Sequence, residues 1–259
     1  MLDLSIIIVS WNVSELLKKC LKSVYKNQGK INLKIFVIDN TSTDNTVEMV
    51  KTNFPDVNII ANKNNLGFAT ANNQGIKKSQ AKYILLLNPD TEIGENTLKN
   101  MVEFMEENYK IGIAGCKHCN PDWTLQPSVR RFPRLLPILL ILTKVAKIIP
   151  GLPALRSYLA QDFDYKIAQP AEQVAGSFFM IRKKTLEEIG LLDEKFFLWF
   201  EEVDYCKRAK AAGWQVWYNA NAKIIHYGGQ SFSQRLTIRK QLIFVKSAWY
   251  YFKKHGFVW

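Results

Sequence analysis

Two carboxylates in the first half of the chain stand where predicted buried strands end. The apolar run 83–87 ends abruptly in Asn88-Pro89-Asp90, and Asp39 follows a shorter apolar run at 35–38. Because Pro89 cannot continue a hydrogen-bonded ladder, the turn is rigid and Asp90 is held beside the strand end. A carboxylate fixed in this way can hold a divalent metal and a diphosphate, although Asn-Pro-Asp is also a common turn sequence.

A third group of acids follows an aromatic segment in the second half. Residues 196–200 read FFLWF, and Glu201, Glu202 and Asp204 come directly after them at the predicted start of a helix. Apolar surroundings desolvate a carboxylate and raise its pKa, which suits a general base. The same acids would also serve as ordinary helix-start residues, because the helix dipole favours negative charge there. His226 stands at the end of a later predicted strand. It could serve as a metal ligand, a phosphate contact or a structural residue.

No glycine-rich phosphate loop follows the first predicted strand, where Ser10-Trp11-Asn12 stands instead. This disfavours dinucleotide dehydrogenases and P-loop NTPases. A nucleotide would instead bind through strand-end carboxylates and a divalent cation, with Asp39 toward the base or ribose and Asp90 toward the metal. Mg²⁺ or Mn²⁺ suits such a site, since these hard cations take one or two carboxylates and complete their shell with phosphate oxygens and water.

Strands and helices alternate through the first half of the sequence. We expect strands at 4–9, 35–38, 57–60, 84–87 and 111–114, and helices at 13–26, 44–53, 67–79 and 95–107. This alternation predicts an α/β fold with a mostly parallel central sheet covered by helices on both faces. Ligands bind at the carboxyl ends of the strands in such sheets, and Asn12, Asp39 and Asp90 all fall there.

The second half is less regular. It predicts a strand at 174–182, a helix at 201–212, short strands at 215–218 and 223–227, and a final helix at 233–254. Apolar residues recur at helical spacing in the final helix, at Ile238, Leu242, Val245, Trp249 and Phe252. No linker or repeat interrupts the chain, so we expect one domain over residues 1–259.

The composition is that of a globular protein with reduced cysteines. A chain of 259 residues with 47% hydrophobic composition supports one substantial core. The four cysteines are scattered, and the cluster at 116–119, CKHC, lacks the second group of ligands that a structural zinc site requires. No run reaches the roughly 18 to 20 apolar residues that cross a bilayer, and the sequence opens on a strand without a basic leader, so we expect a cytoplasmic protein.

The net charge of +12 is concentrated in two segments that contain no Asp or Glu. One covers residues 123–161, where six Lys or Arg accompany many aliphatic residues, and the other covers 205–259, with ten Lys or Arg and the final helix. Basic and apolar residues together suit an anionic membrane surface, and the aliphatic density at 135–149 favours lipid over nucleic acid. The alternative is an internal helical cover with solvated cations.

Seven short motifs in order resemble those of family 2 glycosyltransferases, most closely the rhamnosyltransferase-like branch. They are SIIIVSWN at 5–12, VIDNTSTD at 37–44, NLGFATAN at 65–72, LNPD at 87–90, AGSF at 175–178, FEEVD at 200–204 and His226. The resemblance covers roughly residues 4 to 230. It implies a GT-A fold, in a Rossmann-like arrangement, and inverting transfer from a nucleotide-diphosphate sugar.

The resemblance also implies a role for each matched residue. The donor would be bound by Asn12, Asp39, Asn65, Gly67, Asn88 and Asp90, the metal by Asp90 and His226, and the acceptor by Gly176, Trp199 and Glu201, with Glu202 as the base. Two positions depart from the family pattern. Glu202 replaces an Asp, which leaves Glu201 or Asp204 as possible substitutes, and Asn88 stands where many relatives carry Asp, which weakens the expected hold on the metal.

These expectations combine into one functional hypothesis. The chain would move a sugar, rhamnose by the branch resemblance, to a glycan or polyprenyl-linked acceptor in cell-surface polysaccharide synthesis. Residues 1–115 would bind the nucleotide sugar, 116–230 would bind the acceptor and catalyse transfer, and 231–259 would form an amphipathic helix at the inner face of the cell membrane. A non-catalytic nucleotide-sugar or membrane-binding module, and a nucleotidyltransferase, are the alternatives.

Overall fold

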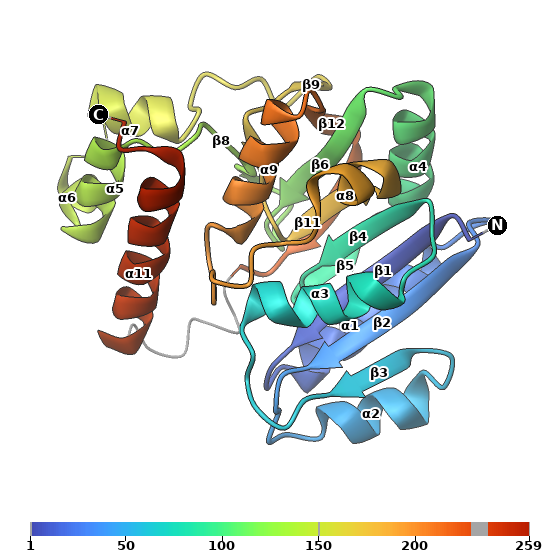
Figure 1. The fold of residues 1–259 in the computed structure, drawn as a ribbon. Helices are drawn as coiled ribbons and strands as arrows, with labels where there is room; N and C mark the ends of the chain where they lie inside the picture. The colour runs from blue at the N-terminus through green and yellow to red at the C-terminus, as the bar shows by residue number, and fades with distance from the viewer. Residues whose placement is uncertain (1, 150, 229–237, 259) are drawn as a thin grey trace.

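A ten-stranded mixed sheet runs through the computed structural model, which describes residues 2–149, 151–228 and 238–258. The strand order is β3-β2-β1-β4-β11-β6-β12-β5, with β7 paired to β6 and β9 paired to β12 (Figure 1). The strands are β1 Leu4–Ser10, β2 Leu33–Asp39, β3 Asn58–Ala61, β4 Tyr83–Leu87, β5 Thr91–Ile93, β6 Ile111–Cys119, β7 Leu125–Gln126, β9 Gln169–Pro170, β11 Phe178–Arg182 and β12 Gln215–His226. A separate two-stranded sheet pairs β8, Val129–Arg130, with β10, Gln173–Val174.

The expectation of a mostly parallel sheet is wrong for the second half of the chain. β1, β2, β3 and β4 are parallel, as predicted, and β12 is parallel to β6, but β11 is antiparallel to both of its neighbours, β4 and β6, and β5 is antiparallel to β12. The reason lies in the connections. Parallel neighbours require a crossover that returns the chain to the starting edge. The chain leaves β6 at its carboxyl end and enters β11 from that same end, so β11 must run back in the opposite direction.

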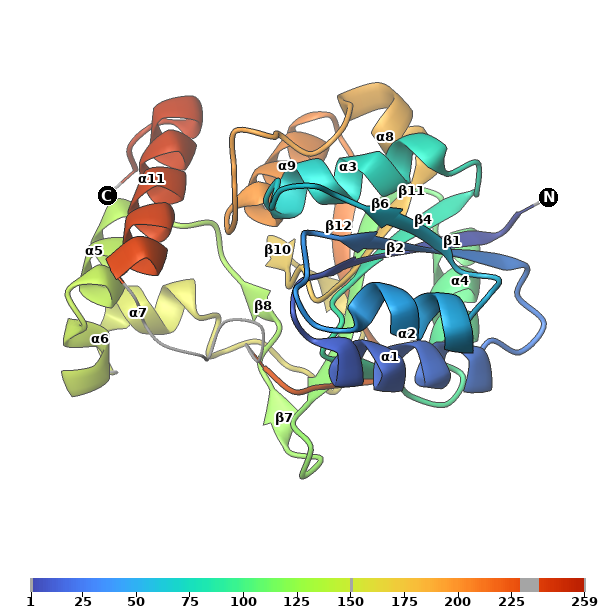
Figure 2. The same cartoon turned by 90° about the horizontal axis from the view of Figure 1, so that it is seen from below.

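Helices cover both faces of the sheet (Figure 2). One face carries α1 Ser14–Lys26, α2 Thr46–Asn53 and α4 Thr97–Glu107, and the other carries α3 Phe68–Lys78, α8 Lys183–Ile189 and α9 Glu201–Ala211. Successive strand side chains point to opposite faces, so Ile6 and Ile8 of β1 join the first core and Ile7 joins the second. This two-sided burial explains the unbroken apolar runs in the sequence.

Most predicted elements lie close to their predicted positions. The differences arise where the sequence has no strong periodicity: β5, α8, the short strands β7 to β9 and the helices between residues 135 and 158 were not predicted. The strand expected at 174–182 is divided into β10 and β11. The two short strands expected at 215–218 and 223–227 are one strand, β12, whose register against β6 shifts between Asn219 and Lys223. Such a shift marks a bulge, which bends a strand without ending it.

A third cluster of helices sits at the carboxyl edge of the sheet beside α9 (Figure 1). It contains α5 Leu135–Leu142, α6 Val145–Ile148, α7 Pro153–Tyr158 and α11 Ile238–His255. The start of the predicted final helix, at 233–237, lies outside the described residues. Ala248, Tyr251 and Phe252 of α11 are buried against the 196–203 segment and α5, whereas Trp249 is 62% exposed. Of the helices in the described ranges, none combines the length and apolar character that crossing a membrane demands.

Candidate active site

Asp39 ends β2 at the carboxyl edge of the sheet and is buried. Its Oδ2 accepts a hydrogen bond of 3.0 Å from the Ser42 backbone N–H. Its Oδ1 is buried and has no hydrogen-bond partner in the protein. An unpartnered buried carboxylate oxygen is costly, so it indicates a place where a ligand donor is received.

Asn12 lies in the neighbouring loop after β1 and supports Asp39. Its backbone N–H donates to Ser42 Oγ over 2.9 Å, and its Oδ1 accepts from the Thr43 backbone N–H over 2.6 Å. The side chain is therefore occupied in holding the loop that follows β2. Asn12 lies at the strand-end position that the sequence predicted, and its visible contacts hold the 42–43 loop beside Asp39.

The loop before α3 connects the first half of the chain to the aromatic segment of the second. Gly67 has φ = 81°, and a Cβ at this position would lie 2.5 Å from the carbonyl oxygen of Phe197. That carbonyl accepts a 2.7 Å hydrogen bond from the Phe68 N–H. Asn65 Oδ1 accepts from the Gly67 N–H over 2.9 Å and so fixes the turn. Only glycine combines this φ with so close an approach.

Asp90 and His226 meet at the end of the sheet, although 136 positions of numbering separate them. His226 is paired with Thr91 across β12 and β5, and the Tyr227 N–H donates to the Asp90 carbonyl over 2.9 Å. His226 Nε2 lies 3.5 Å from Asp90 Oδ1 and has no hydrogen-bond partner. Both side chains are largely shielded from solvent. The predicted metal pair is therefore brought together.

These two residues fit a divalent cation that is shared with a diphosphate. Asp90 offers a hard oxygen ligand and His226 an open imidazole nitrogen. Within the described residues no group of three or more His, Cys, Asp or Glu converges as a self-sufficient metal site. Mg²⁺ and Mn²⁺ commonly bind in this incomplete way, because substrate phosphates and water supply the remaining ligands. The four cysteines are free and buried, and the CKHC cluster forms part of β6.

Glu202 lies in the first turn of α9 and lines a cavity of about 200 Å³. The walls come from the β8 and β10 region, α7, α11 and the aromatic segment, and they include Arg130, Tyr158, Val174, Trp199 and Phe244. A Cβ on Gly176 would lie 3.6 Å from Glu202 Cγ, so the backbone of Gly176 faces this carboxylate across van der Waals distance. Trp199 and Gly176 thus lie beside Glu202, as the sequence predicted.

The pKa values of the two adjacent glutamates are both raised. Burial raises the pKa of Glu202 above its ordinary value of 4.5, partly opposed by backbone N–H groups of the helix start. Burial, and then the charge of Glu202, raise the pKa of Glu201 well above the same value. Glu202 Oε2 and Glu201 Oε2 have no hydrogen-bond partners. Glu201 is 4% exposed and is not among the residues that line the cavity.

Asp204 is unsuited to act as a base because its carboxylate is fully engaged. It accepts hydrogen bonds from Arg208 Nε at 2.8 Å, and from Lys254 Nζ and His255 Nε2 at 2.7 Å each. Burial alone would raise the pKa of Asp204, but the hydrogen bonds from His255 and Lys254 and the charge of Arg208 lower it. The structure therefore leaves Glu202 as the acid that faces open space.

The metal pair and Glu202 belong to one connected region. The Asn88 N–H donates to the Ser177 carbonyl over 3.0 Å, and Ser177 follows the glycine that faces Glu202. Asn88 precedes the turn that carries Asp90. The carboxyl ends of β1, β2 and β4 are adjacent in register, which places Asp39 at the same edge.

Sequence reasoning missed several residues around this region. Arg130 and Tyr158 line the cavity, Gln126 contacts the ring of His226, and His118 bonds Ser177 Oγ over 2.7 Å. Their neighbours are distant in the chain, so no local spacing marks them. The acid-free composition of 123–161 was the only signal that pointed to Arg130.

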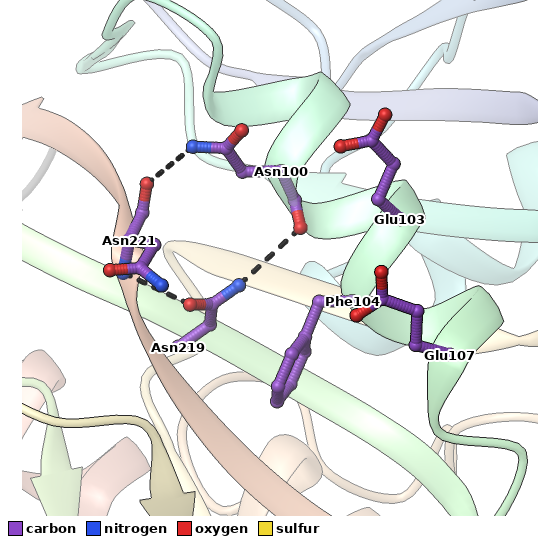
Figure 3. Close-up of a pocket in the computed structure, with 6 residues that line it drawn as sticks. All are labelled: Asn100, Glu103, Phe104, Glu107, Asn219 and Asn221. Atoms are coloured by element: carbon purple, nitrogen blue, oxygen red, sulfur yellow. Dashed lines mark hydrogen bonds between the residues drawn. The ribbon is translucent and has the colours of Figure 1, made fainter.

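A larger hollow of about 480 Å³ lies between α4 and β12 and contains none of the predicted site residues (Figure 3). Its asparagines bond one another: Asn100 Nδ2 donates to the Asn221 carbonyl over 2.7 Å, and Asn219 Oδ1 accepts from the Asn221 N–H over 3.0 Å. Its polar groups therefore largely satisfy themselves.

Comparison with known proteins identifies the family. The sequence profile described as Glycosyl transferase family 2 matches residues 5–190. The chain belongs to glycosyl transferase family 2. The chain is 24% identical over 208 residues to the N-acetylglucosaminyl-diphospho-decaprenol L-rhamnosyltransferase of Mycobacterium tuberculosis, covering 76% of this chain and 67% of that protein. It is 27% identical over 222 residues to the low-salt glycan biosynthesis hexosyltransferase Agl10 of Haloferax volcanii, covering 80% and 62%.

Solved structures agree on the fold. The mannosyltransferase PcManGT from Pyrobaculum calidifontis, in complex with GDP-Man and Mn²⁺, superimposes with a TM-score of 0.65 at 14% identity over 96% of this chain and 64% of that one. GalNAc-T7 with UDP, GalNAc and Mn²⁺ also gives 0.65, at 17% identity over 87% and 44%. The chain spans between 44% and 67% of the length of these four proteins. The rhamnosyltransferase-like branch that its motifs indicated is confirmed by the named relatives.

Proposed function

We propose that this chain transfers a sugar from a nucleotide-diphosphate donor to a hydroxyl acceptor with inversion at the anomeric carbon. The observation that supports this most directly is a set of three buried side-chain atoms without partners: Asp39 Oδ1, His226 Nε2 and Glu202 Oε2. Each lies at the carboxyl edge of the sheet or in the cavity beside it. Before its substrate binds, a nucleotide-sugar site needs open atoms for three tasks: contacting the nucleoside, ligating the metal and removing the acceptor proton.

On the donor side, Asp39 receives hydrogen-bond donors of the nucleoside, and Asn12 and Asn65 keep the flanking loops in shape. Asp90 and His226 would hold Mg²⁺ or Mn²⁺ against the diphosphate. When bound, the metal neutralises charge on the departing nucleoside diphosphate. Asn88 contributes its backbone, which links the metal turn to Ser177.

On the acceptor side, Glu202 removes the proton of the attacking hydroxyl. Burial raises the pKa of Glu202, which makes its ionised carboxylate a stronger base than an exposed one. The cavity beside it is walled by Trp199, Phe200 and Phe244 and by the cationic Arg130. This combination suits a sugar ring that carries an anionic group, such as a lipid-linked diphosphate. Glu201 is buried and does not line the cavity, and a protonated Glu201 would place no second negative charge beside the ionised Glu202.

We further propose that the cluster of α5, α6 and α11 rests on an anionic membrane. These neighbouring helices expose large apolar side chains, namely Leu136, Leu139, Ile148, Ile149, Leu242, Val245 and Trp249. Exposed Arg134, Lys144 and Lys246 accompany them. Apolar side chains and cations on adjacent helices are the chemistry of interfacial docking, and each cation near such a surface contributes on the order of 1 kcal/mol. A polyprenyl-linked acceptor would be presented from the same surface.

A donor screen tests the transferase proposal. The protein is incubated with rhamnose, glucose, galactose, mannose and acetamido-sugar nucleotides, with and without Mn²⁺, and donor hydrolysis is followed over hours. We expect slow, Mn²⁺-stimulated hydrolysis of one donor, with rhamnose on a thymidine or uridine carrier as the first candidate. Binding of a donor without hydrolysis or transfer would favour the non-catalytic module. Release of pyrophosphate from a nucleoside triphosphate would favour a nucleotidyltransferase.

A further inference from the structure

A chain of side-chain hydrogen bonds runs from the tip of the β6–β7 hairpin to His226. Thr124 Oγ1 lies 2.6 Å from Asp122 Oδ1, and Asn120 Nδ2 lies 2.9 Å from Thr124 Oγ1. Gln126 Nε2 lies 3.0 Å from Asn120 Oδ1. The chain ends where Gln126 Oε1 meets His226 Nδ1 at 2.6 Å. The remaining nitrogen of His226 then faces Asp90.

The carboxylate of Asp122 determines which group donates and which accepts in every later hydrogen bond of this chain. Hydrogen bonds from Thr124 lower the pKa of Asp122, so this side chain is ionised and can only accept. Thr124 must therefore give its single hydroxyl proton to Asp122, and its oxygen is left to accept from the Asn120 amide group. With its NH₂ turned to Thr124, Asn120 presents Oδ1 to Gln126.

The orientation of the Gln126 amide group determines which of its atoms faces the imidazole of His226. Its Nε2 donates to Asn120 Oδ1, and it also lies 3.5 Å from the backbone carbonyl of His226, a second acceptor on the same side. The amide orientation is thus supported by two acceptors. Gln126 Oε1 consequently faces His226 Nδ1 and requires a proton there. In a neutral imidazole, a proton on Nδ1 leaves Nε2 with a free lone pair.

Asp90 competes for the same proton from the other side of the ring. Its Oδ1 lies 3.5 Å from His226 Nε2, which is long for a hydrogen bond but close enough to favour a proton on Nε2 if nothing opposed it. A proton there would turn His226 into a hydrogen-bond donor to Asp90 and would block the nitrogen from binding a cation. The 2.6 Å bond to Gln126 decides the competition.

We infer that Gln126, oriented by Asn120, is a positioning residue that keeps the proton of His226 on Nδ1, so that Nε2 stays available as a metal ligand beside Asp90. The inference rests on the proposed metal site. Ligating histidines generally need such a partner on their other nitrogen, and its loss commonly weakens metal binding about 10- to 100-fold. Here the partner comes from an edge hairpin, 100 positions away from the histidine.

The tautomer can be measured without any metal. Nitrogen-15 NMR of the imidazoles in the full chain, at about pH 8.5, where unperturbed imidazoles are neutral, separates the two tautomers by chemical shift. The protein supplies both reference states. His118 Nδ1 faces the Cys116 carbonyl, which requires a proton on Nδ1, and His255 Nε2 faces Asp204 Oδ1, which requires a proton on Nε2. We expect His226 to resemble His118.

Two substitutions of Gln126 then separate the effect of its hydrogen bond from the effect of its side-chain size. Gln126→Leu removes the acceptor and should move the His226 signals toward the His255 pattern, whereas Gln126→Glu keeps an acceptor oxygen and should preserve the Nδ1 proton. Mn²⁺ binding, followed by electron paramagnetic resonance, should weaken about 10- to 100-fold in Gln126→Leu and stay near that of the unaltered protein in Gln126→Glu. Asn120→Ala leaves Gln126 in place and should shift both readouts in the same direction by less.

The outcomes test the hydrogen-bond chain from Asp122 to His226, called the relay below, separately from the metal site. A proton on Nε2 of His226 in the unaltered protein, or an unchanged tautomer in both Gln126→Leu and Asn120→Ala, would overturn the relay. An Nδ1 proton in a protein that binds no Mn²⁺ would support the relay and remove the metal site. If Gln126→Leu fails to fold, the Asn120→Ala and Gln126→Glu pair still decides the question.

Discussion

Glu202 acquires its chemistry from its neighbours, because an isolated glutamate is a weak base at neutral pH. Burial raises its pKa, its Oε2 has no hydrogen-bond partner, and Arg130 and the aromatic residues line the cavity beside it. Asp204, two residues along the same helix, has the opposite environment and a lowered pKa. At the scale of single residues, environment rather than residue type therefore separates the pKa of Asp204 from those of the two glutamates.

The variant Glu202→Gln should retain donor binding and lose turnover by about 10²- to 10⁴-fold, the usual share of a general base. In the unaltered enzyme, kcat/KM should fall as pH falls through the raised pKa, because the base must be ionised to act. This acidic limb should lie at higher pH than an ordinary glutamate would give. Steady-state kinetics across pH and donor titration measure both effects. Turnover that survives in Glu202→Gln would remove this residue from the role.

The buried Glu201 should make stability depend on pH. Its folded-state pKa is raised, so the native state holds a proton that the unfolded state releases. The associated stability is present below the ordinary value of 4.5 and is lost as pH rises through the raised pKa. Glu201→Gln should flatten this decline and unfold at higher denaturant concentration than the unaltered protein at pH 8. If the unfolding free energy changed equally between pH 5 and pH 8 in the two proteins, Glu201 would not be the source of this pH dependence.

Helix α11 acts as a support for the aromatic segment that leads into α9. Trp199 and Phe200 both have positive φ, 64° and 71°, which costs about 1–3 kcal/mol each for a residue with a side chain. Phe244 packs edge-on against both rings, at 5.6 and 5.4 Å between centroids, and Ser247 Oγ donates to the Leu198 carbonyl over 2.8 Å. The contacts of α11 therefore hold a strained segment in the conformation that places Glu202.

The main polar attachment of α11 is the buried carboxylate of Asp204. We expect Asp204→Asn to lower the unfolding free energy at neutral pH by about 3 kcal/mol, near the low end for breaking a buried ion pair, because Lys254 and Arg208 still reach solvent. Since the pKa of Asp204 is lowered, this contribution is present above the ordinary value of 3.8 and is lost as pH falls through the lowered pKa.

A matched control is available in the exposed pair of Asp162 with Arg131. Asp162→Asn should cost much less than Asp204→Asn, because an exposed ion pair is screened by solvent and contributes little to stability. Urea unfolding measures both variants, and limited proteolysis near residue 238 reports whether α11 has loosened. Equal losses in the two variants would show that Asp204 does not anchor the helix.

At the scale of the whole molecule, Asp39 and the Asp90–His226 pair lie at the carboxyl edge of the sheet, and helices α5, α6 and α11 cluster beside α9, whose first turn carries Glu202. In the proposed mechanism, a membrane-embedded acceptor would reach Glu202 from the side of these helices, and a water-soluble donor would enter from the sheet edge. The large exposed apolar side chains on these helices and their cations are the parts that would touch the bilayer.

The double variant Leu242→Glu with Trp249→Glu should reduce binding to vesicles that contain anionic lipid by about tenfold or more, since it removes two apolar contacts and adds two repelled charges. Binding of the unaltered protein should fall with added salt. Tyr109→Glu, which changes an aromatic residue that is 73% exposed elsewhere on the molecule, is the control. Co-sedimentation that is indifferent to anionic lipid, to salt and to the double variant would exclude this docking surface.

Much of the first half of the fold followed from the sequence because its elements carry local signals. Apolar runs such as Tyr83–Leu87 are long enough to mark a strand buried on both faces, and turn residues mark where each strand stops. The strand-end positions of Asp39 and Asp90 were predictable for the same reason. The direction of β11 was not, since nothing within Phe178–Arg182 records the end from which the chain returns to the sheet.

The sequence by itself determined which residue types stand at strand ends and which segments lack acids. Only the tertiary structure decided which acid faces the cavity, that one face of α11 is buried while the other is exposed, and that Gln126 reaches the ring of His226. Local patterns record hydrogen bonding and burial over a few residues. A pKa, a tautomer or a cavity depends on atoms brought together from distant parts of the chain, and these meet only when the sheet is assembled.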